Sequence, residues 1–330
     1  MRYYDLKLID PHGRIAFRAT SHPNGKFDPG ALQIEFDAPV ATFGAPIGGQ
    51  TISLHGVPLP FLSQARQFGL ELDDAGKTIQ APYTVELLGG MSAGLPLAKP
   101  LQAGLLVAGT VLQSWGNWEG TEMTLELLVV AGGGHSMERP ANIVLNWRAG
   151  MSLGDALKSC LSIAFPGVPV QVSVEPNLAL SYDNPAFFAT LEQLAIWVEQ
   201  FTQAQFGSTV RIAQQGAVIS VFDSSYKPPL VQLAFTDFVG QPTWVRPRTM
   251  QAKLVLRGDL TLGSLVKLPA NFLDAAGITV TAPNSFAQQA KSKLTFDGPW
   301  QVIALRHIGQ SRSPDGASWV TVIEVLPAGN

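Results

Sequence analysis

The sequence predicts a mainly β protein that carries a small α+β insert, and three observations support this fold class. Thirty-two glycines and 24 prolines are spread along the 330 residues, so turn signals recur at short intervals. Alternating apolar and polar residues fill both ends of the chain, whereas the middle shows a helical period. We therefore expect a first β-barrel domain over residues 1–148, a small α+β domain over 149–222 and a second β-barrel domain over 223–330.

In residues 1–148, short β-type runs alternate with turn signals. Asn24-Gly25 suits a tight turn that requires positive φ angles. Residues 105–113 and 122–130 predict a hairpin whose turn lies at Trp115-Gly116-Asn117. The other predicted strands cover residues 3–9, 15–19, 31–36, 51–54, 69–72 and 78–88.

The middle domain is predicted to contain two helices followed by a small hairpin. Ser152 with Asp155, and Thr190 with Gln193, have the spacing at which an N-cap side chain and the side chain three residues later satisfy free backbone N–H groups. Gly207 is suited to end the second helix. The apolar stripe of the first helix is Leu153, Ala156, Leu157, Cys160 and Leu161, and that of the second is Leu191, Leu194, Ala195, Val198 and Phe201. The strands of the hairpin cover residues 209–213 and 217–222.

β-type runs resume after Tyr226-Lys227-Pro228-Pro229, which we interpret as a linker. Residues 300–308 and 318–325 alternate with period two on either side of a turn at residues 313–316, the strongest hairpin signal in the chain. Trp300 and Trp319 occupy apolar positions of this alternation, so both indoles are expected to be buried. The remaining predicted strands cover residues 231–235, 250–256, 264–268, 277–280 and 293–296.

The charge content narrows the classes of partner. Charged residues make up 14% of the chain and the formal net charge is −3, without a Lys/Arg cluster, which argues against nucleic-acid binding. A surface with so little charge is typical of a protomer that neighbouring subunits cover, although a larger monomeric core would also account for it. Charged residues interrupt the first ten positions, and no apolar run approaches the ~20 residues that span a bilayer. We expect a protein made and kept soluble in the cytoplasm, without membrane insertion.

Motifs that resemble catalytic or phosphate-binding sequences lack the structural context they need. The segment 90–94, Gly-Met-Ser-Ala-Gly, matches a nucleophile elbow at Ser92, but prolines follow it where the elbow requires a helix. Gly76-Lys77-Thr78 has Glu71 where a phosphate-binding loop has its first glycine, and Gly132-Gly133-Gly134 lacks the spacing of a dinucleotide loop. The first two are interpreted as loop and turn sequences, and the third as an interdomain linker.

The other chemically active side chains are dispersed. Asp73-Asp74 is typical of an acidic turn, and Cys160 lies on an apolar helical stripe, where a buried thiol is inert. We therefore predict a protein that is not an enzyme and that has no catalytic, cofactor-binding or metal-binding residues. The five histidines do not have the spacing of metal ligands; they are His12, His22, His55, His135 and His307. Tryptophans on alternating strands usually fill a core or an interface, although they could instead line a sugar-binding face; they are Trp115, Trp118, Trp244, Trp300 and Trp319.

Several segments together resemble the central baseplate hub proteins of Mu-like contractile phages. The resemblance covers most of the chain and extends to the N-terminal hub part of type VI secretion spike proteins. It is carried by the order of barrel, insert and barrel and by weak patterns. Those patterns lie in residues 105–111, 118–125, 153–161, 166–167, 190–195, 298–303 and 307–321.

The resemblance implies a homotrimer whose two tube-forming barrels per chain make a six-unit ring. Such a hub would be an adaptor between the hexameric tail tube, or a tube-initiator protein, and the trimeric central spike. The chain ends at Asn330, directly after the second barrel, so the spike is expected to be a separate polypeptide. Baseplate wedge proteins and a tape measure protein are further expected partners, with DNA only as passing cargo during genome ejection. The expected location is the tail baseplate of a virion assembled in the host cytoplasm, and the alternative function is a carbohydrate-binding or carbohydrate-active β-protein.

Overall fold

The computed structural model describes residues 2–41, 49–72, 78–91, 102–131, 142–215, 218–246, 248–269 and 298–328. The chain is mainly β with an α+β insert, as predicted. One large sheet is built from thirteen strands of two parts, which we call the N-terminal β part and the C-terminal β part. The first contributes β1 (Arg2–Ile9), β2 (Ile15–Thr20), β3 (Gln33–Ala41), β4 (Gln50–His55), β7 (Thr84–Met91), β8 (Gly104–Glu119) and β9 (Glu122–Ala131). The second contributes β15 (Leu230–Gln232), β16 (Thr243–Arg246), β17 (Thr249–Val255), β18 (Leu265–Lys267), β19 (Pro299–Gln310) and β20 (Trp319–Pro327).

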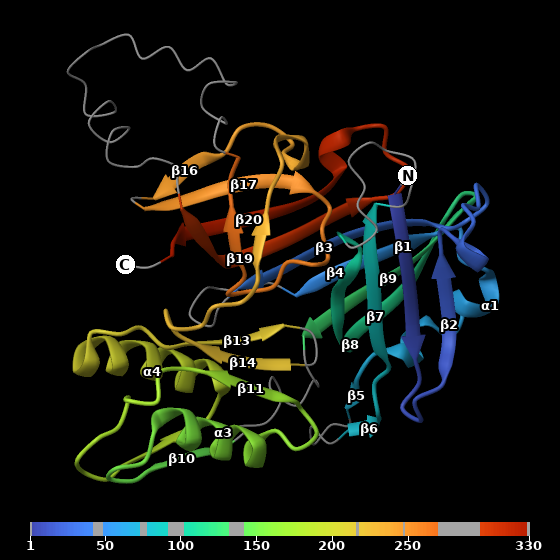
Figure 1. Cartoon of the computed structure of the whole chain (residues 1–330). Helices are drawn as coiled ribbons and strands as arrows, with labels where there is room; N and C mark the ends of the chain where they lie inside the picture. The colour runs from blue at the N-terminus through green and yellow to red at the C-terminus, as the bar shows by residue number, and fades with distance from the viewer. Residues whose placement is uncertain are drawn as a thin grey trace.

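The strand order of the large sheet brings the two ends of the chain together. It runs β16-β17-β20-β19-β3-β4-β9-β8-β7-β1-β2, so β19 of the C-terminal part pairs directly with β3 of the N-terminal part. This antiparallel pairing extends from Ala304↔Ala41 to Gln310↔Glu35. The two β parts therefore share one hydrogen-bonded ladder, as Figure 1 shows at the centre of the molecule.

The C-terminal β part closes on itself around a hydrophobic core. Strand β19 pairs with β18 through Pro299–Gln301 and with β3 from Ala304 onward, and a bulge between Val302 and Ala304 marks the change of partner. Strand β15 runs parallel to β18, and Phe238, a few residues later, bridges to Leu254 of β17. The segment from β15 to Phe238 thus closes a small barrel with strands β17, β20, β19 and β18. Its core includes Met250, Leu254, Val266, Trp300, Val302 and Ile323.

The N-terminal β part curves around a second core that the C-terminal part completes. Its buried residues include Tyr4, Leu6, Ile52 and Leu127, together with Leu256 and Trp319 from the far end of the chain. The helix α1 (Leu59–Leu62) and the short strands β5 (Glu71–Leu72) and β6 (Thr78–Gln80) lie beside it. The predicted strand over 78–88 is therefore interrupted, because β6 ends at Gln80 and β7 starts at Thr84.

The insert has its own core and lies below the two β parts in Figure 1. Helices α3 (Leu153–Ala164) and α4 (Leu191–Phe206) pack against a two-stranded sheet and a three-stranded sheet. The core includes Ile143, Leu145 and Trp147, which precede the predicted domain boundary after residue 148. The two-stranded sheet contains β10 (Ile143–Trp147) and β12 (Asn184–Phe188). The three-stranded sheet contains, in order, β11 (Val170–Ser173), β14 (Val218–Phe222) and β13 (Arg211–Gln215).

Both predicted helix starts are confirmed by their hydrogen bonds. The Ser152 hydroxyl accepts a bond from the Asp155 backbone N–H at 3.1 Å, and the Thr190 hydroxyl accepts one from Gln193 at 3.2 Å. Gly207 follows α4 with φ of 67°, the left-handed conformation that favours glycine after a helix. None of the helices in the described ranges is long and apolar enough to cross a membrane.

The predicted hairpins of residues 105–130 and 300–325 are both present, but the turn of the first is displaced. Strand β8 continues through Trp115-Gly116-Asn117 to Glu119, and the chain turns at Gly120, where φ is 61°. Gly116 packs closely against Leu62, because a Cβ there would lie 2.9 Å from Cδ2 and 3.1 Å from the carbonyl oxygen of Leu62. The strands predicted over 277–280 and 293–296 lie outside the described residues.

Candidate functional site

The described residues hold no cluster of three or more His, Cys, Asp or Glu side chains that could bind a metal ion. Burial raises the pKa of the Cys160 thiol to about 11, so the thiolate is scarce at neutral pH. Ser92, Asp73 and His135 lie outside the described residues, as do Asp74, Lys77 and the glycines 132–134.

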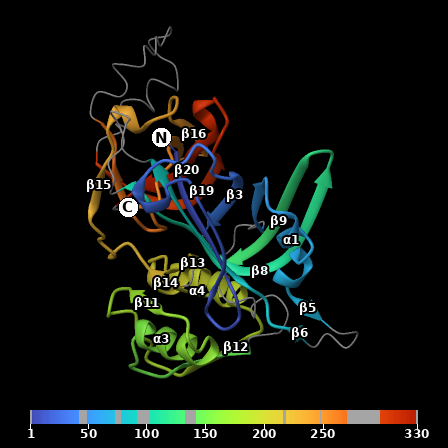
Figure 2. The same ribbon diagram turned by 90° about the vertical axis from the view of Figure 1, so that its right-hand side faces the viewer.

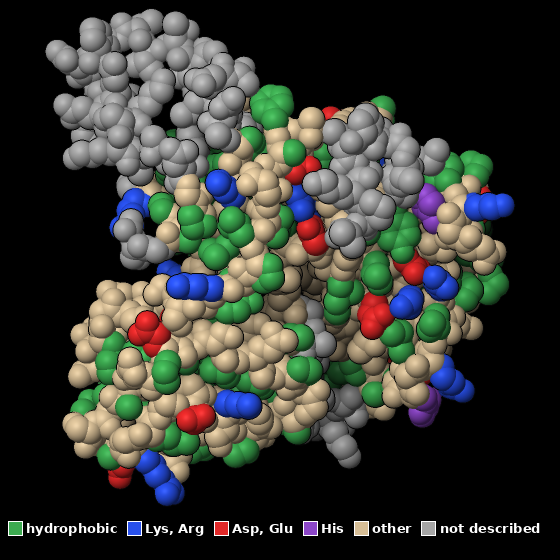
Figure 3. Space-filling model, in the orientation of Figure 1, with side chains coloured by type: hydrophobic (Ala, Val, Ile, Leu, Met, Phe, Trp, Pro, Cys, Tyr) green, Lys and Arg blue, Asp and Glu red, His purple; other side chains and the backbone are tan. Residues whose placement is uncertain are grey.

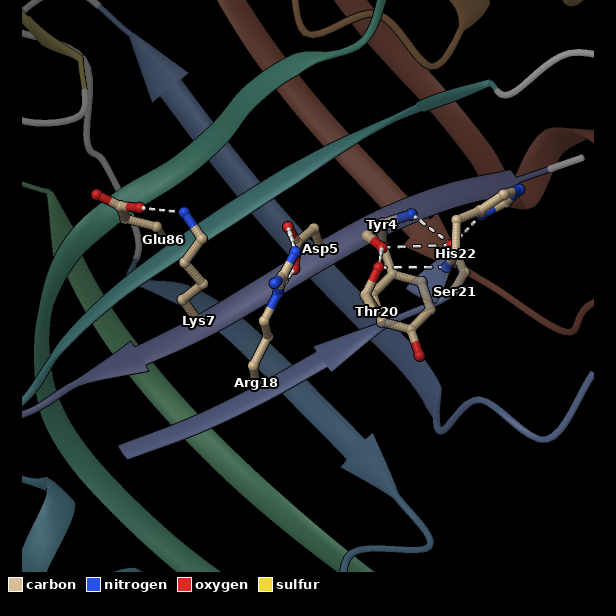
Figure 4. Close-up of polar contacts among 8 residues, drawn as sticks. All are labelled: Tyr4, Asp5, Lys7, Arg18, Thr20, Ser21, His22 and Glu86. Carbon is tan, nitrogen blue, oxygen red and sulfur yellow. Dashed lines mark hydrogen bonds and ion pairs between the residues drawn. The ribbon is translucent and has the colours of Figure 1, made fainter. Parts of the chain in front are cut away.

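A contact between serine and histidine that the sequence analysis missed lies at the end of β2. Ser21 Oγ is 2.8 Å from His22 Nδ1, and the same hydroxyl accepts a bond from the Tyr4 backbone N–H at 2.9 Å (Figure 4). Ser21 is only 4% exposed, so a substrate does not reach its hydroxyl. The pair tightens the junction of β1 and β2 and has no geometry for nucleophilic catalysis.

Charged pairs along β1 fix the register of the outer strands. Arg18 of β2 binds the Asp5 carboxylate through two bonds of 2.8 Å, and Lys7 lies 3.2 Å from Glu86 of β7 (Figure 4). Lys7 and Glu86 face each other in the ladder, whereas Arg18 stands opposite Lys7 and reaches diagonally to Asp5; opposite charges in both arrangements stabilise the pairing. These side chains therefore act in the framework of the sheet.

The two β parts are joined a second time where β8 begins. The Gly258 backbone N–H donates to the Gln102 carbonyl oxygen at 2.8 Å. Next to this bond, a Cβ on Gly104 would lie 2.3 Å from the Gly258 carbonyl oxygen, and a Cβ on Gly258 would lie 2.6 Å from Gly104 backbone atoms. Two glycines thus let two backbones touch, because any side chain would separate them.

A buried ionic network lies beside this crossing. Arg257, only 4% exposed, forms two bonds to the Asp259 carboxylate, at 2.9 and 2.6 Å, and one of 3.3 Å to Asp237. Asp237 also accepts a bond from the Gln102 side chain at 3.4 Å, which brings the start of β8 into the network. A buried charge of this kind is stable only while its partners are in place, so the network holds the two β parts in one arrangement.

Both tryptophans of the closing hairpin are buried, as predicted, and Trp319 spans the two β parts. Trp300 and Trp319 are each 2% exposed. The Trp319 indole N–H donates to the Gly90 carbonyl oxygen at 2.9 Å, and its ring packs edge-on against Phe36. The Arg2 guanidinium lies 5.9 Å from the centre of the same ring. The start and end of the chain are therefore held together.

An exposed surface with two tryptophans lies at the far end of the β8–β9 hairpin, residues 113–128, which we call the arm. Figure 2 shows the arm extending away from the rest of the molecule. Trp115 is 48% exposed and Trp118 66% exposed. Of the two predicted roles for these tryptophans, in a core or in an interface, the core role is therefore wrong for both. Rigid aromatic side chains that remain in solvent on a projecting hairpin are typical of protein interfaces. The candidate site is thus the exposed aromatic surface of the arm, on a protein whose two β parts are fixed to each other by the contacts of Trp319, Gly104, Gly258 and Arg257, which we call the fixed junction.

Comparisons with solved structures find proteins whose fold is similar to that of this chain. No family model matches the sequence, and no curated protein matches it. The crystal structure of the tail protein from Neisseria meningitidis MC58 matches over 99% of this chain and 97% of that chain, with a TM-score of 0.50 and 12% identity. The 43 kDa tail protein of prophage MuSo2 from Shewanella oneidensis matches over 99% and 98%, with a TM-score of 0.49 and 9% identity. An Escherichia coli component of the type VI secretion system matches over 91% and 74%, with a TM-score of 0.47 and 8% identity.

The first of these comparisons covers both chains almost completely, so it includes the N-terminal β part, the insert and the C-terminal β part together. At 12% identity it concerns the fold and not the conservation of any side chain. This chain therefore has the fold of a tail protein.

Proposed function

We propose that this chain is the structural hub of a contractile-tail baseplate, a trimeric adaptor that joins a hexameric tail tube to a trimeric central spike and forms part of the DNA conduit. The observation that carries the proposal is the likeness to a tail protein over 99% of the chain. The fixed junction supports it, because an adaptor under load needs its two β parts held in one relative position.

The proposed domains follow the same division: residues 1–148 and 223–330 each form a tube-forming barrel, and residues 149–222 form the insert. Three copies of two similar barrels present six related surfaces on one side and three-fold symmetry on the other. This arrangement resolves the mismatch between a six-fold tube and a three-fold spike. Open strand edges are hidden where such barrels associate.

The proposed hub is not an enzyme. Its partners are the tube or a tube-initiator protein, the spike, baseplate wedge proteins and the tape measure protein, in the baseplate of a virion assembled in the host cytoplasm. DNA passes as cargo, and the net charge of −3 favours a conduit wall that does not retain phosphates.

Electron microscopy of an assembled particle tests the proposal. Three copies around the tail axis, between the tube and the spike, are expected. Six copies, a single central copy or a position at the outer edge of the baseplate would refute it. The purified chain is also expected to leave peptidoglycan intact, and robust degradation by the wild-type chain would contradict the non-enzymatic role.

A further inference from the structure

The tip of the arm combines acidic and aromatic side chains. Between residues 113 and 128 the charged residues are Glu119, Glu122 and Glu126, without any lysine or arginine. Glu119 and Glu122 flank the turn and are exposed, next to Trp118, whose indole N–H donates to the Gly120 carbonyl oxygen at 2.8 Å. This hydrogen bond holds the exposed Trp118 side chain in one orientation. The tip is thus a preformed acidic and apolar projection.

A cleft of the opposite character lies between the insert and the C-terminal β part. Its volume is about 850 Å³, and Figure 3 shows the hollow at the left margin of the molecule. Arg211, Lys227 and Arg248 line it, with Glu175 as the acidic side chain of its described lining. Arg211 also lies 3.6 Å from Glu199, so Lys227 and Arg248, both exposed, are the cations most available to a ligand.

The floor of the cleft offers apolar surface. Leu265, Pro299 and Leu326 line it together with Tyr226, and they come from β18, from the ends of β19 and β20 and from the linker before β15. An indole that entered here would contact aliphatic and aromatic carbon, while carboxylates beside it would meet lysine and arginine. The cleft therefore complements the tip in charge and also in apolar surface.

We infer that the cleft of one copy of this chain receives the arm tip of a second copy, with Trp118 against the apolar floor and Glu119 and Glu122 against Lys227 and Arg248. The inference rests on the proposed trimer for the number of copies, but the contact itself rests on opposite charge and on apolar surface at both the tip and the cleft.

The positions of the two surfaces suit a ring. The hollow of the cleft lies at the left of the molecule in Figure 3, and the arm extends to the opposite side, to the right and back of the same orientation, as Figures 1 and 2 show. A contact between two different surfaces of identical chains is head-to-tail, and it forms a closed ring when the rotation per copy divides a full turn. The contact also gives the insert a role, because Arg211 and Glu175 of the insert lie in the cleft wall.

Substitutions that reverse the charges of the tip, of the cleft or of both test the contact directly. The tip variant Glu119→Lys with Glu122→Lys, and the cleft variant Lys227→Glu with Arg248→Glu, are each expected to reduce self-association of the full chain at low salt. The chain that carries all four changes is expected to recover it. Sedimentation provides the readout, and Arg66→Glu with Glu71→Lys, which reverses an exposed ion pair elsewhere, is the control.

Cross-linking detects the contact even where the equilibrium favours single chains. A Thr121→Cys chain mixed with a Ser224→Cys chain places one exposed thiol at the tip and one in the cleft lining, and the native Cys160 is buried. A thiol-reactive cross-linker is expected to join this pair in much higher yield than Thr121→Cys mixed with Ile163→Cys, which places the second thiol at an exposed position on α3.

Equal yields in the two mixtures, or a four-fold variant that associates no better than the separate variants, would overturn the contact. Either result leaves the hub proposal standing, because the copy number and position in the particle test that proposal separately. Conversely, cross-linking in solution without a place at the tail axis would support the contact and refute the hub.

Discussion

The indole N–H of Trp319 donates a hydrogen bond to the carbonyl oxygen of Gly90, a residue 229 positions earlier in the chain. This bond, the Gly104–Gly258 crossing and the Gln102–Asp237 bond of the Arg257 network are contacts between the two β parts in addition to the β3–β19 ladder. They fix how one β part sits on the other. An adaptor that transmits force between two partners depends on such contacts.

Replacing Trp319 by alanine is expected to lower the free energy of unfolding by ~3–5 kcal/mol, because the change leaves a cavity and an unsatisfied carbonyl. Denaturant unfolding measures it. The exposed Trp118→Ala is the matched control and is expected to change stability by less than ~0.5 kcal/mol. Equal effects of the two changes would show that the Trp319 contact is not formed.

Gly104→Ala is expected to destabilise the protein by about 1–3 kcal/mol, because the new methyl group overlaps the Gly258 carbonyl oxygen and must push two backbones apart. Gly316→Ala is the control, since a Cβ at Gly316 meets nothing within 4 Å. Thermal unfolding of both variants provides the comparison. A Gly104→Ala protein as stable as Gly316→Ala would mean that the backbones do not touch here.

Arg257→Met is expected to cost about 3–5 kcal/mol, because it leaves Asp237 and Asp259 without the cation that they share at the junction. If the loss comes from these two unpaired carboxylates, the triple change that also replaces Asp237 and Asp259 by asparagine should recover part of it. Unfolding by urea measures both variants. A loss that is the same in both would assign the effect to packing and not to charge.

The sequence predicted what neighbouring residues determine. Both N-cap hydrogen bonds follow from a spacing of three residues, and the strands at 300–308 and 318–325 and the burial of Trp300 follow from the alternation within each strand. The alternation of Ile143, Leu145 and Trp147 also had a period of two, so β10 was within reach of the same reasoning.

Contacts between distant parts of the chain have no local signal. The β3–β19 pairing joins Glu35 to Gln310, and the network joins Gln102 to Asp237. Gly116 was interpreted as a turn because glycine serves both turns and close packing, and only the position of Leu62 distinguishes the two. The exposed arm was missed for a related reason, since alternation does not show whether a tryptophan faces a core or the solvent.

His307 makes stability depend on pH. It is fully buried on β19, where desolvation lowers its pKa from 6.5 to about 4 and Nδ1 lies 3.0 Å from the Thr321 hydroxyl. Below pH 6.5 the unfolded chain therefore binds a proton that the folded chain does not, so this stability is complete above pH 6.5 and is lost as the pH falls toward 4. The expected loss is about 3 kcal/mol at the acid end. Unfolding free energies measured from pH 8 to pH 4 should show this slope in the wild type and a shallower one in His307→Gln. Parallel curves for the two proteins would show that His307 is not the group that titrates.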